Sequence, residues 1–131
     1  MIVLDTQTWL WWVHDPSKLS ARAASAICAA EKADGMLVSV ISVWEIAVKS
    51  ALGKLELAMD MDAWFRQARA YPNLQIEPLS AGDAIASTRL PGELHRDPAD
   101  RIIVALSRRY GVALVTADKL IRSYPHVVTI W

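Results

Sequence analysis

The chain has 131 residues, 53% of them hydrophobic, with 14 basic and 14 acidic side chains. This length predicts one domain, residues 1–131, with a sizeable buried core. The zero formal net charge argues against a protein that coats nucleic acid by neutralising phosphates, but it permits an enzyme that binds nucleic acid in one local cleft.

Cysteine usage and the apolar runs bear on where the protein works. The single cysteine, Cys28, excludes an intrachain disulfide and fits a reducing cytoplasm, and its alanine-rich surroundings predict a small buried side chain. Asp5 interrupts the opening apolar run, and no apolar stretch approaches the roughly 20 residues that span a bilayer. We therefore expect a cytoplasmic protein with no membrane segment.

Short β-branched runs alternate with helical segments along the chain. The first run, Ile2–Leu4, is uninterrupted and predicts a strand buried on both faces, whereas the alternating run at 74–77 predicts a strand nearer an edge. The predicted strands cover residues 2–4, 36–39, 74–77, 112–115 and 127–130. The predicted helices cover residues 20–32, 42–52, 60 or 62–71, 80–90 and 98–109, with a short one after 118. This order predicts an α/β three-layer sandwich with a mostly parallel sheet of four or five strands.

The last long helix opens with Asp97-Pro98-Ala99-Asp100. Asp97 is expected to cap it, because an aspartate at that position accepts a hydrogen bond from a first-turn N–H. Pro98 then takes the first helical position, where its missing N–H costs nothing. Capping alone accounts for this stretch, and only the positions of the other acids suggest a further role for Asp100.

Four acids from distant parts of the sequence fall just beyond predicted strands or at the helix that leads into one. Asp5 directly follows the first strand, Glu45 lies shortly after the second, and Asp118 lies two residues after a later one. Asp100 opens the helix before that later strand. In open parallel sheets the site lies beyond the carboxyl ends of the strands, so we expect these four acids to lie near one another.

Each of these acids also has a local interpretation. Glu45 completes a possible Ser42-x-x-Glu45 capping box, and Asp118 is placed to cap the short helix that follows it. Asp5 has no cationic neighbour in the sequence, so its burial after a core strand has no obvious local compensation.

Crowded carboxylates favour a bound cation. Two of them about 6 Å apart repel by about 3 kcal/mol at an effective dielectric constant near 20. Hard oxygen ligands without His or Cys suit Mg²⁺ or Mn²⁺ rather than zinc. A carboxylate-bound Mg²⁺ suits phosphoryl transfer, because it activates a water and stabilises the leaving oxygen.

These motifs resemble those of the PIN-domain ribonucleases and, within them, the VapC-type toxins of bacterial toxin–antitoxin pairs. The resemblance covers nearly the whole chain. It rests on Leu4-Asp5-Thr6, Trp11-Trp12, Val38-Ser39, Trp44-Glu45-Ile46-Ala47, His95 to Arg101, Val115 to Asp118, and Ile130-Trp131. It implies a Mg²⁺-dependent endoribonuclease, with Mn²⁺ as a substitute, that acts on RNA, forms a homodimer and is blocked by a cognate antitoxin.

The resemblance also implies roles for individual residues. Asp5, Asp100 and Asp118 would be metal ligands, and Glu45 would act through metal-bound water. Thr6 and Thr116 would hydrogen-bond the carboxylates or a phosphate. The chain departs from the family pattern at two positions, with Gln7 where a histidine is expected and Ala99 where a large aromatic is expected; the smaller Ala99 leaves substrate fit open.

The basic residues near these motifs have more than one interpretation. Arg96, Arg101 and Lys119 either grip phosphates or neutralise adjacent carboxylates. The scattered histidines form no metal-ligand spacing and are expected to be structural or surface groups: His14, His95 and His126.

The tryptophan-rich segment Trp9–Val13 also allows several roles. On a helix, Trp9 and Trp12 share a face while Trp11 points elsewhere. Three interpretations are open. The domain itself could enclose these rings, a partner could cover them in a dimer or antitoxin contact, or they could stack on bases.

Three other classes of protein are alternatives. A phosphotransfer receiver domain has a similar length and fold class, but it needs a paired acid after the first strand, where Thr6 follows Asp5. A Mg²⁺-dependent phosphatase needs a second aspartate at the same place. A catalytically silent binding module of the PIN fold is disfavoured because all four acids are present.

Overall fold

The computed structural model describes residues 1–131 and contains one five-stranded parallel sheet. Its strand order is β3-β2-β1-β4-β5. The strands are β1 (Ile2–Leu4), β2 (Met36–Ser39), β3 (Leu74–Glu77), β4 (Ala113–Val115) and β5 (Thr129–Ile130). The predictions of a central first strand and of an edge strand at 74–77 are confirmed, and β5 is shorter than predicted.

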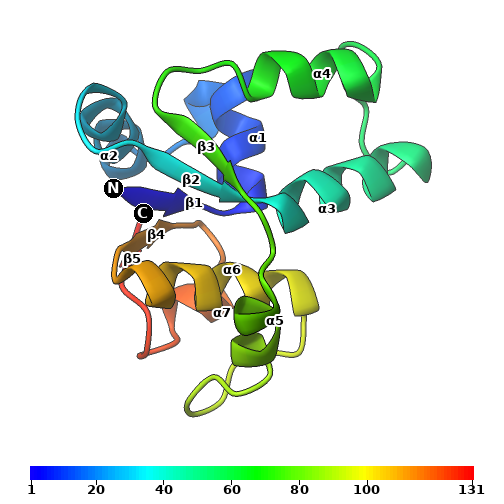
Figure 1. The fold of residues 1–131 in the computed structure, drawn as a ribbon. Helices are drawn as coiled ribbons and strands as arrows, with labels where there is room; N and C mark the ends of the chain where they lie inside the picture. Colours follow the sequence, from blue (N-terminus) through cyan, green and yellow to red (C-terminus); the bar gives the residue numbers. More distant parts are fainter.

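Helices connect these strands and cover both faces of the sheet. They are α1 (Thr6–His14), α2 (Ala21–Lys32), α3 (Val40–Ala51), α4 (Met61–Ala68), α5 (Ala81–Ser87), α6 (Pro98–Tyr110) and α7 (Lys119–Arg122), with a short 3₁₀ turn at Pro16–Lys18. Figure 1 shows α1, α2 and α4 on one side of the sheet and α5, α6 and α7 on the other. The predicted three-layer α/β sandwich is confirmed.

The alternation of side chains along the strands divides the core in two. Ile2 and Leu4 of β1 point into a cluster with Trp9, Ile27 and Trp64, which packs α1, α2 and α4 against the sheet. Val3, between them, points to the other face, into a cluster that contains Leu37, Leu114 and the buried side of α6. Burying β1 on both faces fixes the position of its carboxyl end, where Asp5 begins the next element.

The start of α3 corrects one prediction. A capping box at Ser42 is wrong, because β2 runs directly into the helix and Ser39 is the cap, its hydroxyl accepting from the Ile41 N–H at 3.2 Å. Ser42 is instead buried in the first turn of the helix, at its third residue. Glu45 therefore lies in the second turn and its carboxylate is free of any capping role.

The prediction that Cys28 is buried is also wrong. It is exposed, because the buried face of α2 is formed by Ala23, Ile27 and Ala30, and Cys28 is rotated away from that face. None of the helices is both long enough and apolar enough to span a membrane.

Candidate active site

The four predicted acids lie together in one pocket at the carboxyl edge of the sheet. The pocket has a volume of about 400 Å³. Its lining contains five carboxylates and one cation: Asp5, Glu45, Asp97, Asp100, Asp118 and Lys49, beside Thr6, Gln7, Trp11 and Ala117. The carboxylates come from the ends of β1 and β4 and from α3 and α6, so the parallel topology brings them together as predicted.

Asp5 is the most deeply placed of these acids. It is only 6% exposed and caps α1, with Oδ1 accepting from the Thr8 N–H at 2.8 Å and Oδ2 accepting from the Thr116 hydroxyl at 2.5 Å. Burial raises the pKa of Asp5 above its usual value, and these hydrogen bonds oppose the shift. No cation within ion-pair distance compensates its charge.

Asp118 is joined to Asp5 through the same threonine. The Thr116 hydroxyl accepts from the Asp118 N–H at 3.0 Å while it donates to Asp5. Asp118 also caps α7, because its Oδ1 accepts from the N–H groups of Leu120 and Ile121. Asp118 therefore both caps α7 and lines the pocket, because capping uses only one of its two carboxylate oxygens.

Glu45 is held by a neutral partner. The Thr6 hydroxyl donates to Glu45 Oε1 at 2.5 Å, and the buried Ser42 hydroxyl lies 2.8 Å from the same Thr6 oxygen. Of the two partners proposed for Thr6, a carboxylate or a phosphate, the structure shows the carboxylate.

Asp100 lies in the first turn of α6, as predicted. Asp97 caps this helix, its Oδ1 accepting from the Asp100 N–H at 3.0 Å. The carboxylate of Asp100 is 2.6 Å from His95 Nε2. Burial raises the pKa of Asp100 to about 6, and the hydrogen bond to His95 opposes the shift. His95 was expected to be a structural or surface group, and its contact with Asp100 was not predicted.

The predicted cations lie outside this pocket. Arg101 donates to the backbone carbonyls of Ser87 and Leu94, so it braces the loop before α6 rather than facing the carboxylates. Arg96 is exposed and does not line the pocket, and Lys119 lines a neighbouring one. The cation that does line it is Lys49, one helical turn beyond Glu45 on the same face of α3, a spacing that the sequence already contained.

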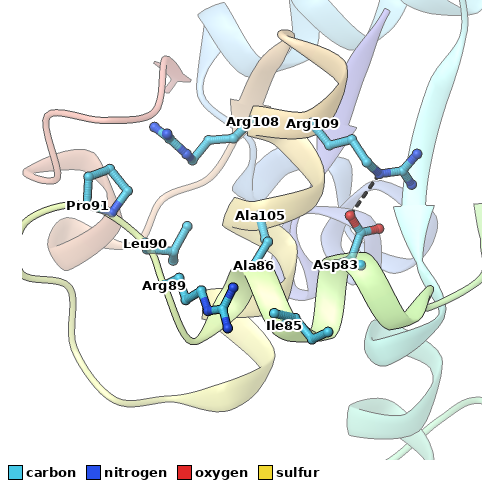
Figure 2. Close-up of a pocket in the computed structure, with 10 residues that line it drawn as sticks. Asp83, Ile85, Ala86, Arg89, Leu90, Pro91, Ala105, Arg108 and Arg109 are labelled. Carbon is cyan, nitrogen blue, oxygen red and sulfur yellow. Dashed lines mark hydrogen bonds and ion pairs between the residues drawn. The ribbon is translucent and has the colours of Figure 1, made fainter.

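A larger cavity of about 600 Å³ lies between α5 and α6 (Figure 2). Its one carboxylate, Asp83, is ion-paired with Arg109 at 2.8 Å, the contact drawn in the figure. The neighbouring Arg108 donates to the backbone carbonyl of His126. Asp83, Arg108 and Arg109 are thus engaged within the fold, and the cavity's remaining charged residue is the lone cation Arg89, so the smaller acidic pocket is the better candidate for chemistry.

The donor set of the acidic pocket meets the chemical needs of a divalent cation. Its ligands are hard oxygens, which suit Mg²⁺ or Mn²⁺. No group of three acidic, histidine or cysteine side chains is arranged to hold an ion as it stands. Mg²⁺ usually keeps several waters and takes only one or two carboxylates, and the pocket has room for a hydrated ion. The residues fit such an ion, held mostly through water.

The tryptophans divide between core and surface. Trp9 is fully buried and meets the Trp64 ring edge-on at 5.0 Å, so the domain itself encloses it. Trp11 packs beside Trp131 at 5.8 Å, and Trp12 beside Tyr71 at 4.4 Å. The most exposed of the six is Trp44, at 60%, on α3 beside the pocket.

The sheet order and the acidic pocket at its carboxyl edge define an α/β protein distinct from a receiver domain, whose strand order is 2-1-3-4-5. The PIN domain family model matches residues 2–127. The chain belongs to the PIN-domain family, and the receiver alternative is wrong.

Individual relatives agree with this assignment. The chain is 36% identical over 133 residues to Ribonuclease VapC22 of Mycobacterium tuberculosis, covering 99% of this chain and 98% of that protein. Its fold is similar to VapBC2 of Rickettsia felis bound to a promoter DNA fragment, with a TM-score of 0.72, 16% identity, and 98% and 97% of the two chains covered. FitAcB of Neisseria gonorrhoeae gives a TM-score of 0.70, 17% identity, and 98% and 96% coverage.

Proposed function

We propose that this protein is a divalent-metal-dependent endoribonuclease of the VapC type, the toxin of a toxin–antitoxin pair, acting in the cytoplasm. The observation that carries the proposal is the convergence of Asp5, Glu45, Asp100 and Asp118 in one pocket. The 36% identity to Ribonuclease VapC22 over nearly the full length supports RNA as the substrate. Structural similarity to a toxin–antitoxin complex of Klebsiella pneumoniae, with a TM-score of 0.65 and 22% identity, supports the fold alone.

The metal is Mg²⁺, with Mn²⁺ as a substitute. When bound, such an ion polarises the phosphate and activates a water for attack on phosphorus. Asp5, Asp100 and Asp118 are the proposed ligands. Thr116 keeps Asp5 and the backbone of Asp118 in fixed relation, because its hydroxyl bonds both.

Glu45 and Lys49 complete the proposed machinery. Glu45, oriented by Thr6, orients the attacking water and accepts its proton. Lys49, on the same face of α3, faces the substrate phosphate and offsets part of the negative charge that the carboxylates gather.

Cleavage of a mixed pool of cellular RNAs tests this function. Wild type is expected to give discrete fragments in Mg²⁺ or Mn²⁺ and none with chelator. Asp100→Asn should lose at least about a hundredfold in rate, the usual cost of removing one group that stabilises transition-state charge. Asp62→Asn, at an exposed carboxylate outside the pocket, is the matched control and should cut as wild type does. Equal cleavage by wild type and Asp100→Asn would contradict the site.

A catalytically silent PIN module remains the second candidate. It predicts RNA binding without cleavage in either metal, from protein freed of any copurified antitoxin. The absence of fragments under those conditions would favour it over the enzyme.

A homodimer and an antitoxin are the proposed protein partners. The strongest support is the apolar surface beside the pocket, where the 60% exposed Trp44 lies with Ile41, Pro98 and Ala99. Exposed tryptophans at such patches anchor interfaces. Light scattering on wild type and Trp44→Glu tests the dimer: equal masses for the two would contradict this face as its interface.

A further inference from the structure

A second pocket, next to the acidic one, collects basic side chains. It has a volume of about 540 Å³ and is lined by Arg22, Lys119, Arg122, Ser123, Thr129 and Trp131. Arg22 comes from the first turn of α2, and Lys119 and Arg122 from α7. No single segment of the sequence contains this cluster, so the fold alone assembles it. We call it the basic pocket.

The three cations of the basic pocket are not neutralised within the protein. No side-chain or terminal carboxylate lies within 4.0 Å of their nitrogens. No hydrogen bond from these side chains to another protein group is present either, in contrast to Arg101 and Arg109. All three residues are exposed. Three like charges facing one cavity repel one another, and an anion bound among them relieves that repulsion.

Lining residues of the basic pocket and of the acidic pocket are neighbours at two places. Asp118 lines the acidic pocket and the next residue, Lys119, lines the basic one. On the other side, Trp11 lines the acidic pocket, Trp131 lines the basic one, and their rings are 5.8 Å apart. A continuous chain molecule can therefore pass from one pocket to the other without leaving the surface.

The charges of the two pockets indicate which kind of chain molecule binds there. The acidic pocket carries five carboxylates against one lysine, so by itself it repels a polyanion. Nucleic-acid affinity comes mainly from cations that contact phosphates. A strand whose scissile phosphate enters the acidic pocket therefore gains binding free energy from cations that hold its flanking phosphates nearby.

We propose that the basic pocket binds the backbone phosphates of single-stranded RNA that flank the cleavage position. Arg22, Lys119 and Arg122 contact the phosphates, while Ser123 and Thr129 supply hydroxyl donors. This proposal deepens the proposed nuclease function and rests on it for the substrate.

Binding of a labelled RNA tests the pocket separately from catalysis. The probe is a fluorescein-labelled single-stranded RNA of about 12 nucleotides, within the roughly 4–16 nucleotides that single-strand sites cover. Fluorescence anisotropy is measured in Mg²⁺ with the Asp100→Asn protein, so that the probe stays intact. The Asp100→Asn protein is the parent, and the test variant carries three further substitutions: Arg22→Gln, Lys119→Gln and Arg122→Gln.

The triple change should raise Kd roughly 10- to 100-fold at 0.1 M salt, because up to three phosphate contacts are lost. The slope of log K against log salt should fall by about 2, from about 0.7 per phosphate. A charge-keeping triple, Arg22→Lys, Lys119→Arg and Arg122→Lys, should stay within a few-fold of the parent. A matched control removes three exposed cations elsewhere, Lys32→Gln, Arg66→Gln and Arg89→Gln, and should leave Kd within a few-fold.

The outcomes separate this inference from the function it rests on. If wild type cuts RNA but the triple variant binds the probe like its parent, the basic pocket is not the flanking site and the nuclease stands. If wild type cuts nothing while the triple variant still loses affinity and salt slope, the pocket is an RNA site on a silent module. Equal loss in the control triple, or no binding by the parent, overturns the inference. Circular dichroism of every variant confirms folding.

Discussion

Acidic side chains gather at both ends of α6, but only those at the carboxyl end are paired with an arginine. At its amino end, Asp100 lies in a pocket with four other carboxylates, and its protein partner is His95. At its carboxyl end, Arg109 lies 2.8 Å from Asp83, the contact drawn in Figure 2. Arg109 also lies 3.0 Å from Glu77, and both carboxylates are buried. Tyr110 adds a third contact, its hydroxyl donating to Glu77 at 2.8 Å.

The difference separates acids whose charge is compensated within the chain from acids whose charge is not. Buried carboxylates paired with a fixed arginine have their charge compensated within the chain, and the hydrogen bonds to those carboxylates raise the pKa of Arg109. The pocket carboxylates lack such a partner, and burial raises the pKa of both Asp5 and Asp100. Their charge is not compensated by a cation of the chain, which is the condition that the proposed cation site requires.

The largest stability effect is expected at the compensated end. Arg109→Met leaves Glu77 and Asp83 buried without a counter-charge and should lower the free energy of unfolding by about 3 kcal/mol, the low end for a broken pair because the guanidinium is 43% exposed. Urea unfolding measures this loss. Arg108→Met, the neighbouring arginine, should cost much less. Similar losses in the two variants would mean that Arg109 acts through packing and not through charge.

Added metal should act only at the other end. At a hundred times its Kd, Mg²⁺ stabilises a folded protein by about 2.7 kcal/mol if it does not bind the unfolded chain. Thermal melts of wild type should shift upward by several degrees, and Asp5→Asn should lose most of that shift. Asp83→Asn, at the compensated end, should keep it. A full shift in Asp5→Asn would place the ion elsewhere.

The sequence predicted the uncompensated acids well, for a simple reason. Parallel strands share a carboxyl edge, so Asp5 and Asp118 could be placed together from the ends of two apolar runs. Asp100 followed from the helix start at Pro98. These inferences need only strand direction, which the alternation of elements supplies.

What the sequence did not give depends on contacts between distant side chains. The pairing of Arg109 with Glu77 requires an edge strand and the last turn of α6 to meet across 32 positions. Arg22 of α2 and Arg122 of α7 meet at one pocket beside Thr129 of β5, a convergence that no local pattern encodes. The capping box at Ser42 failed for the opposite reason: a valid local motif was overridden by a strand that runs straight into the helix at Ser39.

The raised pKa of Asp100 predicts a pH effect of intermediate size. In the folded protein Asp100 releases its proton near pH 6, whereas in the unfolded chain it does so near 3.8. The free energy of unfolding should therefore fall as pH rises from about 4 to about 6, by about 2 kcal/mol for a partly exposed group. Asp100→Asn should remove this fall in chelator. Urea unfolding across this range, with the exposed Asp62→Asn as control, measures it. Parallel profiles for wild type and Asp100→Asn would contradict the prediction.

The smallest effect concerns the neutral hydroxyl that donates a hydrogen bond to one pocket acid, Glu45. Thr6→Val removes the hydroxyl that donates to Glu45 and should lower kcat for RNA about fivefold to tenfold, the worth of about 1 kcal/mol, with KM nearly unchanged. Unfolding free energy should change by no more than about 1 kcal/mol. Thr6→Ser keeps the hydroxyl and should restore kcat, which a merely steric role would not require. If Thr6→Ser is as slow as Thr6→Val, the threonine methyl rather than the hydrogen bond positions Glu45, and neutral hydrogen bonding is not what orders this carboxylate.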